Sequence, residues 1–138
     1  MINVLIVSHC NLTKELIATA EVIAGKQENL FYIDKDIKNE NLQSLRIKID
    51  EILAKISKPE GTLILTDILG GTPCNASLLL AGKYNLEVLT GVNLPILLSA
   101  IFASKFATTA KELADKVLSD GQKSMVNAKQ LMFEKLKA

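Results

Sequence analysis

Short, largely apolar runs alternate with segments of helical periodicity along nearly all of the 138 residues. The first run is VLIV at residues 4–7, and three more follow at residues 30–33, 62–65 and 87–90. Runs this short and continuously apolar are typical of strands that a parallel sheet buries on both faces. Because a helical segment separates each pair of runs, the sequence predicts an α/β fold with right-handed crossovers.

The intervening segments carry apolar residues three and four positions apart, which predicts amphipathic helices. Gly25 is a suitable stop for the first helix. Thr72 is predicted as an N-cap with Pro73 in the first turn, and Thr109 with Glu112 has the spacing of a capping box. The predicted helices cover residues 12–24, 42–56, 72 to about 82, 95 to about 101, and 109 to about 121.

The last residues are less decisive, because the apolar positions in 124–133 fit neither period clearly. They are compatible with a terminal helix or with an added edge strand. The prediction is therefore a single domain over residues 1–138, with an α/β core over 1–121 and a C-terminal strand or tail over 122–138. Its core is a doubly wound, parallel, four-stranded sheet of order 2-1-3-4.

Composition argues against several classes of function, among them binding to nucleic acid and to membranes. Sixteen Lys and Arg balance fifteen Asp and Glu, and aromatic residues make up only 4 % of the chain. No broad basic field exists for nucleic acid or a membrane surface, and there is no evident platform for stacking bases. The longest apolar stretch, residues 94–103, is too short to span a bilayer. The N-terminus also lacks the basic region of a signal peptide, so we expect a cytoplasmic protein without membrane insertion.

The strongest candidates for chemistry are His9 and Asp67, which follow the first and third predicted strands. Ligands of open α/β sheets bind outside the carboxyl ends of strands where the strand order switches, and strands one and three are neighbours there. A carboxylate beside an imidazole selects its tautomer and makes the other ring nitrogen more nucleophilic. The plainer alternative is that His9 closes a strand and Asp67 caps a turn.

Gly70, Gly71 and Thr72 come three to five residues after Asp67 and precede a predicted helix. Glycines allow a close backbone approach, and free N–H groups with the Thr72 hydroxyl suit an anion. Alone, two glycines before a helix indicate only a turn. Together with His9 and Asp67, they suggest a phosphoryl group carried on His9.

Metal and disulfide chemistry are poorly supported. Cys10 and Cys74 are too few for a disulfide scaffold, and one His with two separated thiols is a poor metal set. We expect two free thiols, no metal and no cofactor.

Four blocks together resemble the IIA component of the mannose family of the bacterial phosphoenolpyruvate:sugar phosphotransferase system. The resemblance runs in register from the first strand to about Gly121. The blocks are IVSH at 6–9, GKQEN at 25–29, TDILGGTPCN at 66–75 and GVNLP at 91–95. It implies a cytoplasmic phosphotransferase that accepts a phosphoryl group from HPr and passes it to a IIB subunit, which phosphorylates the incoming sugar.

The resemblance also implies residue roles. His9 matches the phosphorylated histidine, Asp67 its carboxylate partner, and Thr72 a hydroxyl residue near the phosphoryl group, with Gly70 and Gly71 in the preceding turn. It further implies a homodimer that exchanges a C-terminal strand. Two departures are Leu69, where an aromatic residue is expected, and the missing fused IIB domain, which predicts a separate IIB polypeptide.

Two other functions stay open from the sequence. One is a regulatory or binding module that is gated by phosphohistidine. The other is the phosphocarrier subunit of a dihydroxyacetone kinase system, which fits the GGTPCN block less well.

Overall fold

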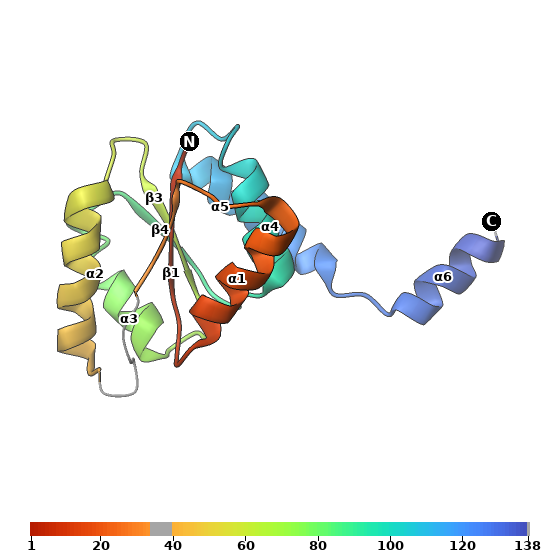
Figure 1. Cartoon of the computed structure of the whole chain (residues 1–138), viewed down its shortest axis with the longest axis horizontal. Coiled ribbons are helices and arrows are strands. Elements are labelled where there is room, and N and C mark those ends of the chain that lie inside the picture. Colours follow the sequence, from red (N-terminus) through yellow and green to blue (C-terminus); the bar gives the residue numbers. More distant parts are fainter. Residues whose placement is uncertain (34–39, 138) are drawn as a thin grey trace.

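A four-stranded parallel sheet forms the centre of the molecule in the computed structural model, which describes residues 1–33 and 40–137 (Figure 1). The strands lie in the order β2-β1-β3-β4, which confirms the predicted topology. The central pair β1 and β3 is in register from Asn3 opposite Thr62 to Val7 opposite Thr66. The four strands are β1 (Asn3–Val7), β2 (Leu30–Tyr32), β3 (Thr62–Thr66) and β4 (Leu86–Leu89).

Helices cover both faces of this sheet (Figure 1). Helices α2 and α3 pack on one face, and α1, α4 and α5 pack on the other. The helices are α1 (Leu12–Ala24), α2 (Leu42–Ile56), α3 (Thr72–Leu78), α4 (Leu94–Ala103), α5 (Ala110–Ser124) and α6 (Ala128–Lys137).

Alternation along the central strands divides the core into two layers. Val4 and Ile6 of β1 point into the cluster formed with α1, α4 and α5. Leu5 and Val7 point into the opposite cluster, which Leu45, Ile49 and Leu53 of α2 complete. Successive side chains of a strand face opposite sides, so a continuously apolar strand supplies both layers. This explains why the apolar runs of the sequence are unbroken.

Both boundaries of α3 differ from the prediction. Gly71 is the N-cap of α3, and Thr72 is its first residue, without a side-chain capping bond. The helix ends at Leu78 rather than near Gly82, because backbone bonds to the third preceding residue replace the α-helical pattern, as from Leu80 N–H to the Ser77 carbonyl.

Helix α5 continues past its predicted end at Gly121 to Ser124. A Cβ at Gly121 would lie 2.7 Å from Ile96 Cγ1, so the glycine allows α4 and α5 to approach closely. Thr109 caps the helix as predicted, since its hydroxyl accepts the Glu112 N–H at 3.1 Å. The Glu112 side chain does not complete the capping box with Thr109. Its carboxylate accepts hydrogen bonds from Thr108 instead.

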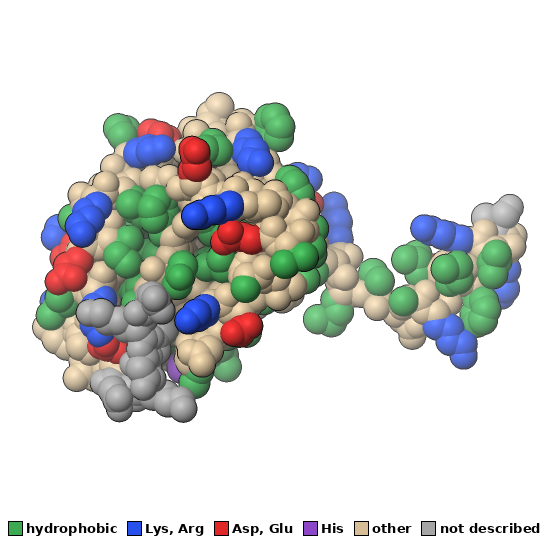
Figure 2. Space-filling view, in the orientation of Figure 1, with side chains coloured by type: hydrophobic (Ala, Val, Ile, Leu, Met, Phe, Trp, Pro, Cys, Tyr) green, Lys and Arg blue, Asp and Glu red, His purple; other side chains and the backbone are tan. Residues whose placement is uncertain are grey.

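The expected C-terminal edge strand is not formed, because residues 128–137 are helical. Their sequence, AKQLMFEKLK, contains strong helix formers and no glycine, proline or β-branched residue. Asn127 adds a cap by accepting the Gln130 N–H at 3.0 Å. Helix α6 lies apart from the sheet domain with its hydrophobic side chains uncovered (Figures 1 and 2). Among the described residues, no helix is long and apolar enough to cross a membrane.

Candidate functional site

The site is built where β1 and β3 end at the same edge of the sheet. Val7 and Thr66 are paired in register, His9 follows β1 by two residues, and Asp67 follows β3 directly. Residues 58 positions apart in the chain therefore meet: His9 Nδ1 lies 2.7 Å from Asp67 Oδ2. The predicted proximity of these two side chains is confirmed.

Three donors converge on the Asp67 carboxylate. Oδ2 accepts the His9 backbone N–H at 2.9 Å as well as the ring nitrogen, and Oδ1 accepts the Ile68 N–H at 2.9 Å. Partial burial works to raise the pKa of Asp67, but the bonds from His9 and Ile68 outweigh it and hold that pKa below its ordinary value. Asp67 is therefore ionised at neutral pH.

An ionised carboxylate can only accept hydrogen bonds, so Nδ1 of His9 carries the proton. In the neutral imidazole, the remaining ring nitrogen, Nε2, then has its lone pair free. The His9 side chain is 49 % exposed, whereas that of Asp67 is 14 % exposed. The arrangement thus presents an oriented nucleophilic nitrogen to an incoming partner and keeps the orienting carboxylate behind it.

The backbone of Asp67 is held by the loop that follows β4. The Gly91 N–H donates to the Asp67 carbonyl at 2.8 Å, and the Val92 N–H donates to the Thr66 carbonyl at 3.0 Å. Gly91 has φ +78°, a left-handed conformation that favours glycine. The supporting roles of Gly91 and of the Ile68 N–H were not predicted, because backbone donors leave no residue-type signal. Gly91, which follows the fourth apolar run, is the one sequence signal that could have indicated a tight turn after β4.

Gly71 lies against the imidazole. A Cβ at this position would be 3.0 Å from His9 Cε1 and 2.9 Å from Ile68 Cγ2, so any larger residue would crowd the ring. Gly70 has φ +83°, and the Asn75 side chain holds its carbonyl at 3.1 Å. Thr72 follows, half-buried, at the start of α3. The structure therefore places Gly71 directly beside the His9 ring. Gly70 and Thr72 are the residues before and after Gly71 in the chain.

The rim of the site is apolar. Ile68 and Leu69, directly after Asp67, are 59 % and 76 % exposed. Leu12, at the start of α1, is also exposed, and its N–H donates to the His9 carbonyl at 3.4 Å. An exposed apolar rim around a half-exposed imidazole suits a protein partner better than a small polar ligand.

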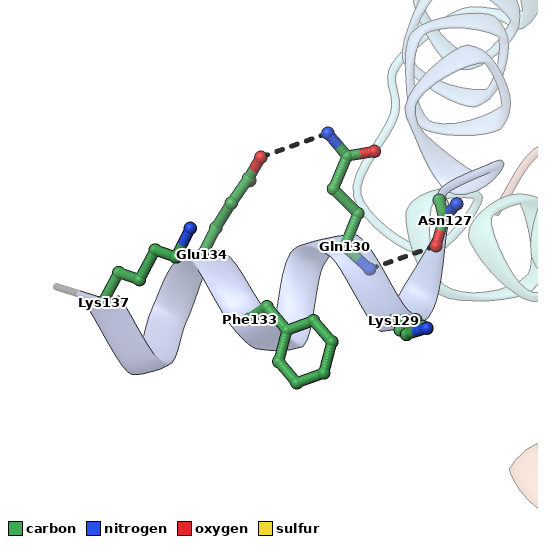
Figure 3. A pocket seen from close by; sticks show the side chains of 6 residues that line it. All are labelled: Asn127, Lys129, Gln130, Phe133, Glu134 and Lys137. Atoms are coloured by element: carbon green, nitrogen blue, oxygen red, sulfur yellow. Dashed lines mark hydrogen bonds between the residues drawn. The ribbon is translucent and has the colours of Figure 1, made fainter.

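Two other hollows on the described part of the surface are lined by none of the residues of this site. One of about 390 Å³ runs along α6 beside Phe133, and its polar bonds join neighbours of the same helix, such as Gln130 and Glu134 (Figure 3). Another of about 410 Å³ is lined by Phe106 and Lys116, among others. Cys10 and Cys74 are free thiols. Within residues 1–33 and 40–137, no cluster of three or more His, Cys, Asp or Glu side chains is suited to a metal ion.

Comparison with known proteins gives one consistent result. The family model described as "PTS system fructose IIA component" matches residues 3–118. The chain is 33 % identical over 135 residues to the mannose-specific EIIAB component of Escherichia coli K12. That match covers 97 % of this chain but 42 % of the relative, so the chain spans less than half of that protein's length.

Two further relatives are closer in length. The fructose-specific EIIA component of Bacillus subtilis is 35 % identical over 102 residues, which is 73 % of this chain and 69 % of the relative. The crystal structure of phosphotransferase system component EIIA from Streptococcus agalactiae superposes with a TM-score of 0.85 at 29 % identity, covering 94 % of this chain and 99 % of that one.

Proposed function

The chain belongs to the mannose-family IIA components of the phosphoenolpyruvate:sugar phosphotransferase system, and from this premise we propose that it carries a phosphoryl group on His9. The donor would be the phosphocarrier HPr and the acceptor a IIB subunit. The observation that carries the proposal is the 2.7 Å bond between His9 Nδ1 and Asp67, which leaves Nε2 as the nucleophile.

The proposed step is an in-line transfer between imidazole nitrogens. His9 Nε2 attacks the phosphorus of the donor phosphohistidine. A new N–P bond forms as the donor's N–P bond breaks, and the bonding pair returns to the donor nitrogen. The proton on His9 Nδ1 stays in place, so the ring becomes positively charged, and the Asp67 carboxylate stabilises that charge through its short bond. Transfer to the IIB subunit is the same step in reverse.

Phosphoryl binding is assigned to Gly70, Gly71 and Thr72. The Gly71 N–H already donates to the Ile68 carbonyl at 3.2 Å, so the contribution of Gly71 is the space beside the ring. Gly70 permits the left-handed turn that brings this segment to His9. The Thr72 hydroxyl is the donor proposed for the phosphoryl oxygens.

The partners and the location follow from the same family. We expect both HPr and the IIB subunit to cover the apolar rim of Leu12, Ile68 and Leu69 when they reach His9. The protein would act in the cytoplasm as a homodimer. No sugar is assigned, because the relatives are named for mannose, fructose and sorbose; IIB and membrane subunits would set that choice.

The test is phosphorylation by phosphoenolpyruvate, enzyme I and HPr, followed by intact mass. We expect one acid-labile phosphoryl group on the wild type and none on His9→Ala. Asn11→Ala is the matched control, since Asn11 is exposed next to the site and makes no side-chain capping bond. A folded wild type that stays unlabelled with its matched HPr, or a labelled His9→Ala, would refute the proposal and favour a binding module.

A further inference from the structure

The loop that carries His9 has an unusual backbone. Only four residues, 8–11, connect β1 to α1. Cys10 in this loop has φ +52°, and among the described residues it is the one non-glycine with positive φ. A left-handed backbone conformation is strained for a residue with a Cβ, so contacts elsewhere must hold the loop in this shape.

Two buried hydroxyl groups provide such a contact. Ser8 is fully buried, Thr13 is 3 % exposed, and their Oγ atoms are hydrogen-bonded to each other. Ser8 Oγ also accepts the Thr13 backbone N–H at 3.0 Å. These bonds tie the end of β1 to the first turn of α1 across the loop.

The Ser8 hydroxyl caps the N-terminus of α1 in place of the N-cap residue Asn11. The first N–H groups of a helix have no partner within it, and the N-cap side chain normally accepts one of them. Asn11, the N-cap of α1, makes no such bond. Ser8 accepts the N–H of Thr13, the second residue of α1, from outside the helix.

His9 lies inside the loop that these bonds close. Its backbone N–H and its ring Nδ1 both donate to Asp67 Oδ2, at 2.9 and 2.7 Å. One oxygen can hold both donors only while the His9 backbone stays in place relative to β3. Neither Ser8 nor Thr13 contacts the ring through its hydroxyl, so any effect of the pair on chemistry passes through the loop backbone.

We propose that Ser8 and Thr13 are positioning residues for phosphoryl transfer: their buried hydroxyl pair locks the β1–α1 loop so that Asp67 can hold His9 at two points. The proposal rests on the proposed function of His9. Without the pair, the strained loop relaxes around Cys10, the His9 N–H leaves Asp67, and Nδ1 no longer holds its proton in one tautomer.

The experiment compares Ser8→Ala, Thr13→Val and Thr13→Ser with the wild type. Two quantities are measured: the rate of phosphorylation at saturating phospho-HPr, and the nitrogen NMR signals of the only imidazole in the chain. Ser104→Ala is the control. Ser104 is also fully buried and hydrogen-bonded, to Asn29 and to the Ile101 carbonyl, but its carbonyl accepts the Ile2 N–H at the opposite end of β1.

We expect Ser8→Ala and Thr13→Val to slow phosphorylation roughly 10- to 100-fold, the loss typical of a misplaced reacting group. Their imidazole signals should change from one tautomer to a mixture. Thr13→Ser should restore both readouts, and Ser104→Ala should leave both unchanged even though it lowers the melting temperature.

The proposal is overturned if Ser8→Ala and Thr13→Val keep the wild-type tautomer and rate, or if Ser104→Ala slows transfer equally. If one variant fails to fold, the other with Thr13→Ser still decides. The NMR readout needs no phosphoryl donor. A wild type that is not phosphorylated while the variants still shift the tautomer would therefore refute the proposed function and leave the positioning role standing.

Discussion

Replacing Asp67 with Asn tests the division of roles within the site with almost no change in shape. The carboxylate accepts three hydrogen bonds, two from His9 and one from the Ile68 N–H. An amide has one accepting oxygen and one donating NH₂ group. If the amide oxygen faces His9, both His9 bonds survive with a neutral acceptor, and the NH₂ group opposes the Ile68 N–H.

The magnitude follows from those bonds. A hydrogen bond to a charged group contributes about 1.5–3 kcal/mol and a neutral one about 0.5–1.5 kcal/mol, so each His9 bond loses about 1 kcal/mol. Only the bond from the ring Nδ1 acts on the charged ring, and its loss of about 1 kcal/mol corresponds to a roughly fivefold slower transfer. The bond from the backbone N–H places the ring and does not stabilise its charge. His9→Ala, by contrast, removes the accepting nitrogen and should abolish transfer.

The assay is the initial rate of phosphorylation by phospho-HPr at neutral pH, quenched in alkali and read by intact mass. Circular dichroism and thermal unfolding establish that Asp67→Asn is folded. A wild-type rate in Asp67→Asn would refute the assigned role of the carboxylate. A folded Asp67→Asn that is as inactive as His9→Ala would refute the division between nucleophile and orienting group.

Three further results are expected. Gly71→Ala should slow phosphorylation more than it lowers stability, because the new Cβ would lie 3.0 Å from His9 Cε1; equal activity with an unshifted imidazole signal would contradict this. The pKa of Asp67 is lower in the folded chain, so the ionised carboxylate stabilises the fold above the unfolded pKa, and this stabilisation is lost as the pH falls through the folded pKa. The difference in unfolding free energy between wild type and Asp67→Asn should therefore shrink in acid. A difference that stays constant with pH would contradict this role of the pKa. Removing residues 128–138 should leave the melting temperature of a dilute sample nearly unchanged, since α6 buries no residue, whereas Leu53→Ala in the core should cost about 2–5 kcal/mol by urea unfolding.

Local pattern was sufficient for the sheet and most helices. Apolar runs marked β1 to β4, and periodic stripes marked α1 and α2, because a strand or helix with such a pattern has few other ways to bury its apolar side chains. The spacing of Thr109 and Glu112 marked the start of α5. Helix ends were less predictable. Gly121 does not end α5. Its lack of a side chain instead allows Ile96 of α4 to pack close to it, a contact that no local sequence pattern contains.

The C-terminal segment shows a different limit. Residues 124–133 lack a clear period, and the resemblance pointed to a strand, yet α6 forms from residue 128. Good intrinsic helix formers decide the local structure when no sheet edge in the same chain is paired with the segment.

The sequence by itself determined which reactive groups the proposed chemistry can use. It placed one imidazole and one carboxylate at the ends of two strands that the parallel topology makes neighbours, and it put Gly71 where a side chain would obstruct the ring. The tertiary structure alone decided how these groups act together. The two bonds from His9 to one oxygen of Asp67, the support from Gly91 and the buried link between Ser8 and Thr13 depend on interatomic distances of 2.7 to 3.0 Å. Such distances arise from packing between segments, most of them far apart in the chain, and residue patterns carry no information about them.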